Sequence, residues 1–177
     1  MTAPPDAAVE VTTGCVLFTD LVGFTEYNDL VGDQAAVEVL DRQVALAHGV
    51  IESRDGARVV KELGDGLMLW FPTAIDGLTG AANFARAADD ARRSGFPLAM
   101  RMGLHYGECV PRGDDLVGQT VNVAARVSAL AGPGELLVSE PVLEACGPTI
   151  DTSLVLQPVG PVNVKGVTDP IWLQRLG

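Results

Sequence analysis

The 177-residue sequence has few basic and few aromatic residues, and it contains no long uninterrupted apolar run. Its 12 Lys and Arg residues stand against 23 Asp and Glu, which gives a formal net charge of −11 at pH 7. Because binding to a nucleic-acid backbone relies on clustered cations, this balance argues against a nucleic-acid partner. A membrane span needs about 18 or more apolar residues in succession. We therefore expect neither a nucleic acid nor a membrane as a partner.

Cysteine is also scarce, and its three positions are Cys15, Cys109 and Cys146. Their odd number and wide spacing argue for reduced thiols and against a disulfide framework. Residues 1–10 are rich in Pro and Ala and lack the basic and apolar regions of a signal peptide. We expect residues 1–10 to be flexible, residues 11–177 to form one domain with its own core, and the chain to be cytoplasmic.

Two acidic loops are the most informative features that are present. In the first, an apolar run ends at Asp20, and Gly23 then permits a tight turn whose backbone N–H groups can face an anion. In the second, two strand-like runs at 58–63 and 67–71 flank a Gly-Asp-Gly turn, which predicts a hairpin with Asp65 at its tip. Taken singly, such a turn is common in ordinary hairpins.

Asp20 and Asp65 would lie close together if the hairpin pairs with the first strand, since adjacent strands are about 4.8 Å apart. Hard carboxylate ligands without a nearby His or Cys cluster favour Mg²⁺ or Mn²⁺ over zinc. Two divalent cations at a separation of about 3.5–4 Å would fit such a site.

The order of the predicted elements indicates an α+β fold. The longest predicted helix rests on apolar residues spaced three or four apart, namely Val37, Leu40, Val44, Ala47 and Ile51. We expect a strand at 15–18, a helix over 27–53, a hairpin over 58–71, a helix over 74–94, and one bent strand or a strand pair over 98–110. This is the βαββαβ order of a ferredoxin-like core. The predicted C-terminal additions are a helix at 119–130, strands at 135–139 and 171–176, and an irregular stretch at 158–166.

Further polar residues lie in the later part of the chain. Asn122 and Arg126 are four residues apart and share one face of a helix. If this pattern stood alone, Asn122 would be interpreted as a helix cap and Arg126 as the partner of a surface Glu in an ion pair. Arg101 lies inside a predicted strand, where an edge-strand surface charge and a phosphate ligand are equally good interpretations. We interpret His105 and His48 as structural or surface residues.

Four ordered motifs resemble the catalytic domain of the class III nucleotidyl cyclases, and the chain looks most similar to the bacterial, mycobacterial-type soluble adenylate cyclases. The motifs are FTDLVGFT at 18–25, KELGD at 61–65, MRMGLH at 100–105 and VNVAAR at 121–126. The resemblance covers about residues 14–139, with a fainter match at 164–166. It implies the nucleotide cyclase fold, which is a ferredoxin-like core with C-terminal additions.

The resemblance also implies a role for each matching position. Asp20 and Asp65 would hold two divalent cations, Mg²⁺ or Mn²⁺, with help from the Leu21 carbonyl. Lys61 and Asp115 match the pair that selects the base, while Asn122 and Arg126 match the pair that orients the ribose and stabilises the transition state. The expected phosphate contacts come from the amides of Gly23, Phe24 and Thr25 and from the side chains of Arg101 and Lys165.

The chemistry of the base-selecting pair favours ATP. Adenine offers an N1 acceptor and an N6 donor, which complement a Lys donor and an Asp acceptor, whereas guanine reverses both contacts. A site left unpaired by the wrong base can discriminate by about 10⁴ or more. We expect attack of the ribose 3′-OH on the α-phosphate to give cyclic AMP and pyrophosphate, in a head-to-tail homodimer with two shared sites.

Two alternatives remain at this stage. The chain could be a catalytically silent nucleotide-binding module of the same fold, although every key side chain is present. It could also be another metal-dependent nucleotidyl transferase on a ferredoxin-like core, such as a cyclic-dinucleotide synthase. That enzyme would have no reason to combine Lys61, Asp115, Asn122 and Arg126.

Overall fold

The computed structural model describes residues 10–177, so residues 1–9 of the start that we expect to be flexible lie outside the described residues. Within that range the strands are β1 (Thr12–Leu21), β2 (Arg58–Leu63), β3 (Gly66–Phe71), β4 (Met100–Arg112), β5 (Asp115–Val117), β6 (Leu136–Ser139), β7 (Leu156–Val162) and β8 (Ile171–Leu176). The helices are α1 (Phe24–Val31), α2 (Asp33–Ile51), α3 (Ala74–Arg93), α4 (Gln119–Leu130), α5 (Glu140–Cys146) and a 3₁₀ turn at Gly147–Thr149. None of the described helices combines the length and apolar composition needed to cross a membrane.

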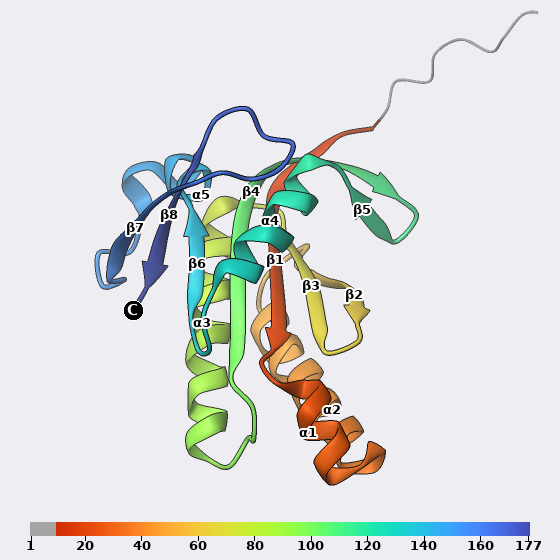
Figure 1. The fold of residues 1–177 in the computed structure, drawn as a ribbon. Helices are drawn as coiled ribbons and strands as arrows, with labels where there is room; N and C mark the ends of the chain where they lie inside the picture. Colours follow the sequence, from red (N-terminus) through yellow and green to blue (C-terminus); the bar gives the residue numbers. More distant parts are fainter. Residues whose placement is uncertain (1–9) are drawn as a thin grey trace, which may run out of the picture.

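The sheet has the order β2-β3-β1-β4-β6-β8-β7, and β5 pairs with β4 outside this path. Strand β1 lies between β3 and β4 and is antiparallel to both. The order β2-β3-β1-β4 with helices between β1 and β2 and between β3 and β4 confirms the predicted α+β ferredoxin-like core. Strand β6 then adds in parallel to β4, and β8 and β7 extend the sheet further (Figure 1).

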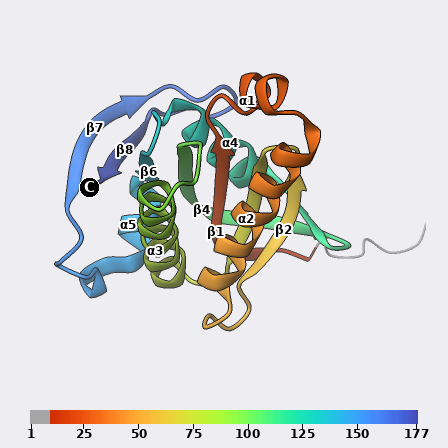
Figure 2. The same ribbon diagram turned by 90° about the horizontal axis from the view of Figure 1, so that it is seen from below.

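The two faces of the sheet bury different side chains because successive residues of a strand point to opposite sides. On one face, Cys15 and Leu17 of β1 join a core that is covered by α2, α3 and α5. On the other face, Val16 packs in a separate cluster with Ala124 of α4. In Figure 1, α4 crosses in front of β1 and β4, whereas α2 and α3 lie behind the sheet, as the view from below in Figure 2 also shows. The face with α4 is therefore the thinly covered one.

The helix predicted over 27–53 is in fact two helices, α1 and α2, that meet at Gly32. Gly32 has φ 85° and ψ 165°, a conformation that ends α1 and starts α2 in a new direction. The predicted stripe is wrong at Val37, which is 52% exposed. Helix α2 buries Val39 and Gln43, which were not predicted, together with Ala47 and Ile51, which were. A pattern of spacings cannot reveal this change of direction.

The C-terminal third is more regular than predicted. The stretch expected to be irregular is partly strand β7, whose Pro158 and Pro161 are tolerated because β7 lies at the edge of the sheet. Helix α5 was also not predicted, and it is only seven residues long. Residues 100–112 form one long strand, which agrees with the first of the two forms expected there.

Helix α4 lies against β4 at positions that carry no side chain. A Cβ atom placed on Gly103 would collide with the backbone of Ser128, and one on Gly107 would lie 2.5 Å from Thr120 Oγ1. The absence of a side chain on β4 therefore sets how closely α4 approaches the sheet.

Gly103→Ala should destabilise the protein by about 1–3 kcal/mol or more, because neither backbone can move freely away from the added methyl group. The matched control is Gly49→Ala in α2, where a Cβ meets no atom within 4 Å. That control should raise stability by about 0.5–1 kcal/mol, since alanine favours a helix. Urea unfolding followed by circular dichroism measures both, and equal effects of the two substitutions would contradict the close approach.

His105 on β4 is buried and has a structural partner. Its Nδ1 lies 2.7 Å from the Oγ of Ser139, which ends the neighbouring strand β6, and its side chain is 8% exposed. Burial lowers the pKa of His105 from 6.5 to about 4, because the charged imidazolium loses its hydration. The interpretation of His105 as a structural residue agrees with this environment.

The lowered pKa of His105 predicts a loss of stability in acid. The imidazole of His105 binds a proton more readily in the unfolded chain than in the folded one. The stability that the neutral, buried imidazole contributes is therefore complete above pH 6.5 and is lost as the pH falls towards about 4. Between pH 7 and pH 4 the difference in unfolding free energy between wild type and His105→Gln should shrink by about 3 kcal/mol. Urea titrations at several pH values test this. The control His48→Gln, at an exposed position of α2, should follow the wild-type pH dependence. If the difference in unfolding free energy between wild type and His105→Gln stays constant between pH 7 and pH 4, the assigned role of His105 is contradicted.

Candidate active site

The sheet register brings the two predicted metal-binding loops together. In the antiparallel pairing of β1 with β3, Asp20 is opposite Gly66, the residue that follows Asp65. The amide of Leu21 also donates a hydrogen bond of 3.2 Å to the Asp65 carbonyl. Asp65 is partly buried beside Asp20. The pKa of the Asp65 carboxyl is raised, mainly by burial and to a smaller extent by the negative charge of Asp20. The predicted proximity of the two carboxylates is therefore present in one chain.

Gln43 of α2 fixes this junction from below the sheet, and sequence reasoning missed it. Its side chain is 1% exposed, and its Nε2 donates hydrogen bonds to Thr19 Oγ1 at 3.3 Å and to the Asp65 carbonyl at 3.2 Å. Gln43 thus connects the residue before Asp20 with the turn that holds Asp65. The available signal was a polar residue four positions from both Val39 and Ala47, on a face that is otherwise apolar.

Arg101 of β4 is the third member of this cluster. It is the register partner of Asp20 across β1 and β4, and its Nε and one terminal nitrogen both lie 2.6–2.7 Å from Asp20 Oδ2. Its side chain is 37% exposed, so the guanidinium also faces solvent. Of the two interpretations of Arg101, a surface charge on an edge strand is excluded because β4 is inside the sheet.

The turn after β1 presents backbone amides at the start of α1. Gly23 has φ 77° and ψ 24°, a left-handed conformation that favours glycine, and α1 begins at the next residue, Phe24. No side chain caps this helix start by a hydrogen bond. The amides of the first turn, which include that of Thr25, are therefore free of a side-chain cap and oriented to attract an anion.

The predicted base-selecting pair also forms within one chain. Lys61 Nζ of β2 donates to Asp115 Oδ2 of β5 at 2.8 Å, although 54 residues separate them, and the Leu116 amide donates to Asp115 Oδ1 at 2.7 Å. The hydrogen bond from Lys61 is the main reason that the pKa of Asp115 is lowered. Both side chains remain about a third exposed, at 34% for Lys61 and 38% for Asp115. The pair is accessible to a ligand.

Asn122 and Arg126 project from the exposed side of α4. A small cavity of about 190 Å³ separates this helix from Asp20 and Arg101, but its α4 wall consists of Ala125, Ser128 and Ala129. Among the described residues, no ion pair or side-chain hydrogen bond joins Asn122 or Arg126 to any other group. One chain therefore does not bring these two side chains onto the carboxylate cluster.

Lys165 lies in the segment between β7 and β8, and it is exposed. Its neighbour Val164 is buried against Val123 and Val127 of α4, and the Gly166 carbonyl accepts a 2.6 Å hydrogen bond from the Gln119 side chain. Lys165 is thereby held next to the helix that carries Asn122 and Arg126. Its phosphate contact stays a prediction.

The donor set at the two acidic loops fits a divalent cation with hard oxygen ligands. Asp20 and Asp65 supply two carboxylates, and the pKa of Asp65 is raised first by burial and then by the nearby Asp20 charge, both of which a bound cation would offset. Within residues 10–177, no group of three or more His, Cys, Asp and Glu residues could form a complete cage for a metal. Such a pair suits Mg²⁺ or Mn²⁺, which are commonly held by one or two carboxylates together with substrate phosphates.

Two curated relatives are similar to nearly the whole chain. A pH-sensitive adenylate cyclase of Mycobacterium tuberculosis is 30% identical over 174 residues, which cover 98% of this chain and 42% of the relative. A putative adenylate cyclase of Rhizobium meliloti is 28% identical over 162 residues, which cover 89% of this chain and 27% of the relative. The chain thus spans less than half the length of these relatives.

Two solved structures share the fold. An adenylate/guanylate cyclase/hydrolase from Silicibacter pomeroyi is 26% identical, with a TM-score of 0.78 over 94% of this chain and 97% of that one. The adenylyl cyclase CyaB from P. aeruginosa has a TM-score of 0.79 over 95% of each chain at 21% identity, which supports the fold alone. Residues 8–174 also match the family described as the adenylate and guanylate cyclase catalytic domain. This chain is a member of that family and has the nucleotide cyclase fold.

Proposed function

We propose that this chain converts ATP to 3′,5′-cyclic AMP and pyrophosphate. The observation that carries the choice of ATP is the 2.8 Å contact between Lys61 and Asp115. Lys61 has three N–H donors and uses one of them here, and each Asp115 oxygen keeps a second acceptor position. Lys61 can therefore donate to adenine N1 and Asp115 can accept from the N6 amino group while the two stay paired. With guanine, the N1–H donor would face the Lys61 donor, and the O6 acceptor would face the Asp115 acceptor.

The phosphates would lie along the end of β1. The first-turn amides of α1 and the guanidinium of Arg101 give this region positive character beside the carboxylates of Asp20 and Asp65. Bound by these carboxylates and the Leu21 carbonyl, two divalent cations would lower the pKa of the attacking ribose hydroxyl and neutralise the departing pyrophosphate. Arg101 and Lys165 would hold the β- and γ-phosphates.

Asn122 and Arg126 would act at the reacting centre. Asn122 would orient the ribose by hydrogen bonding, and Arg126 would donate to the α-phosphate oxygens as negative charge develops on them. Loss of one such preorganised donor costs about 10²–10³ in rate. Because one chain leaves both side chains exposed and apart from the carboxylate cluster, we propose that each site combines Asp20 and Asp65 of one copy with Asn122 and Arg126 of a second, head to tail.

The choice of base is tested by product analysis. With Mn²⁺ and either ATP or GTP, we expect cyclic AMP as the main product and a kcat/KM ratio for ATP over GTP of at least about 10². Asp115→Asn should reduce this ratio, because an amide can donate as well as accept. Asp114→Asn is the matched control: Asp114 is exposed and offers only its backbone carbonyl to Arg58.

Each possible product has a clear meaning in this assay. Cyclic GMP as the main product would contradict the assignment of ATP as the substrate, but the protein would still be a nucleotide cyclase. A linear or cyclic dinucleotide would favour the nucleotidyl transferase alternative. No product from either nucleotide, with nucleotide binding intact, would identify a catalytically silent module.

The shared site is tested by mixing inactive variants. Asp20→Ala and Asn122→Ala should each be nearly inactive, yet an equal mixture should recover about a quarter of the wild-type specific activity, since half of the dimers then hold one intact site out of two. The control mixture, Asp20→Ala with Asp65→Ala, should stay inactive because both changes affect the same half of the site. Native mass spectrometry confirms subunit exchange. Recovery in both mixtures, or in neither, would count against the shared arrangement.

A further inference from the structure

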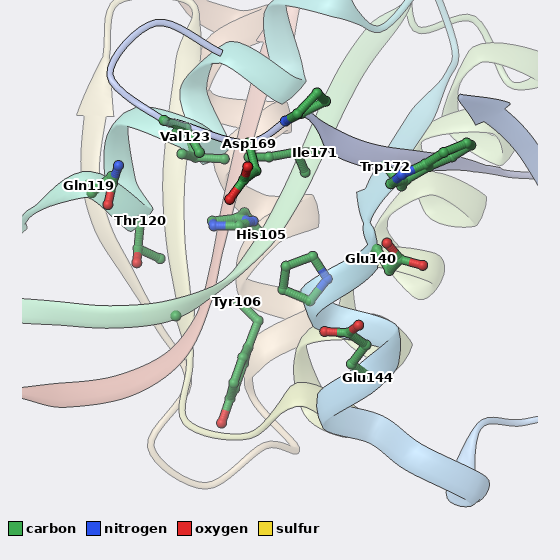
Figure 3. Close-up of a pocket in the computed structure, with 14 residues that line it drawn as sticks. His105, Tyr106, Gln119, Thr120, Val123, Glu140, Glu144, Asp169, Ile171 and Trp172 are labelled. Atoms are coloured by element: carbon green, nitrogen blue, oxygen red, sulfur yellow. The ribbon is translucent and has the colours of Figure 1, made fainter. Parts of the chain in front are cut away.

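A second cavity lies away from the residues proposed for catalysis. It has a volume of about 310 Å³ and is formed by β4, the start of α4, the start of α5 and the segment that leads into β8. Figure 3 shows side chains from these elements around it. None of the residues assigned above to metal, base, ribose or phosphate lines this cavity. Thr120 and Val123 of its wall belong to α4, so a ligand here would contact the helix that carries Asn122 and Arg126.

The charge of the lining has one sign. Glu140, Glu144 and Asp169 contribute three carboxylates, and no Lys or Arg lines the cavity. No hydrogen bond or ion pair from another side chain reaches any of the three within the described part of the chain. Glu140 is also favoured by its place in the first turn of α5, so it has a local structural reason to be acidic. Glu144 and Asp169 have no such reason, and together the three create a negative potential.

His105 adds a polar group to the wall of this cavity. His105 is 8% exposed as a residue, and it lies at the centre of the group drawn in Figure 3. Nδ1 is satisfied by Ser139 at 2.7 Å, whereas Nε2 has no hydrogen-bond partner among residues 10–177. The ring is neutral near pH 7, since burial lowers the pKa of His105 to about 4. When Nδ1 carries the proton and donates to Ser139, Nε2 is a free acceptor for an N–H group.

The rest of the wall is apolar. Pro141, Pro170, Ile171 and Trp172 supply it, and Trp172 is 51% exposed, so its ring is available to a ligand at the cavity edge. The volume is at the lower end of the range of about 300–1,000 Å³ that small-molecule sites occupy. An aromatic ring beside carboxylates is also a favourable surface for an ammonium group.

We propose that this cavity binds a small organic cation, namely an amine carried on an apolar body of about the size of one ring. The ammonium group is attracted by Glu140, Glu144 and Asp169 and donates to His105 Nε2, while the apolar body packs against Ile171 and Trp172. A nucleotide or another anion does not fit, because the lining holds no cation to balance its charge.

The test compares three molecules of nearly equal shape and different charge. Phenethylamine is a cation, 2-phenylethanol is neutral and phenylacetate is an anion at pH 7.5. Isothermal titration calorimetry on the full chain should give saturable binding of one phenethylamine per chain, at least about tenfold tighter than either of the others. Equal binding of all three, or no binding of phenethylamine at millimolar concentrations, overturns the proposal.

Conservative variants locate the site. Glu144→Gln and Glu140→Gln change exposed side chains and should each weaken phenethylamine binding about two- to fivefold. Glu38→Gln, at an exposed position of α2, is the matched control and should leave the affinity unchanged.

Backbone resonances of the ¹⁵N-labelled protein provide a map that needs no turnover, so it is independent of the proposed cyclase activity. Shifts at Tyr106, Thr120 and Trp172 support the cavity. Shifts confined to the Asp20 and Asp65 loops would show that the amine binds the other acidic cluster instead, and would overturn the proposal.

Discussion

The pairing of β1 with both β3 and β4 is the constraint on which the rest of the structure depends. It places Asp20 opposite Arg101 on one side and beside the Asp65 turn on the other. The same register sends Leu17 to the face covered by α2 and α3, and Val16 to the face covered by α4. A slip by one residue would exchange the two faces and move Asp20 away from its partners. The hydrophobic core therefore holds the carboxylates in place.

The proximity of two residue pairs could be predicted from different sources. Asp20 and Asp65 lie in acidic loops whose chemistry is visible in the sequence, whereas the pairing of Lys61 with Asp115 was predicted only through the family resemblance. The structure brings each pair together. Gln43 could not be predicted as their support, since its two hydrogen bonds depend on how α2 packs under the sheet.

Each element that was missed has its own physical cause. The break at Gly32 replaces one predicted helix by two, because a single φ value redirects a chain whose spacing pattern continues. Helix α5 is too short to show a periodic pattern, and the two prolines of β7 conceal a strand that is allowed only because it lies at an edge. Gly103 and Gly107 of β4 have a clear structural role, since α4 packs directly on them.

The two ion pairs of the site place different demands on a ligand. Under the proposed function, Lys61 and Asp115 would stay paired while adenine used their remaining donors and acceptors. Asp20 is different, because Arg101 already donates twice to one of its oxygens. A phosphate chain that approaches Asp20 must therefore meet the Arg101 guanidinium as well. In a chain with a net charge of −11, the Arg101 guanidinium offsets part of the negative charge of this acidic cluster.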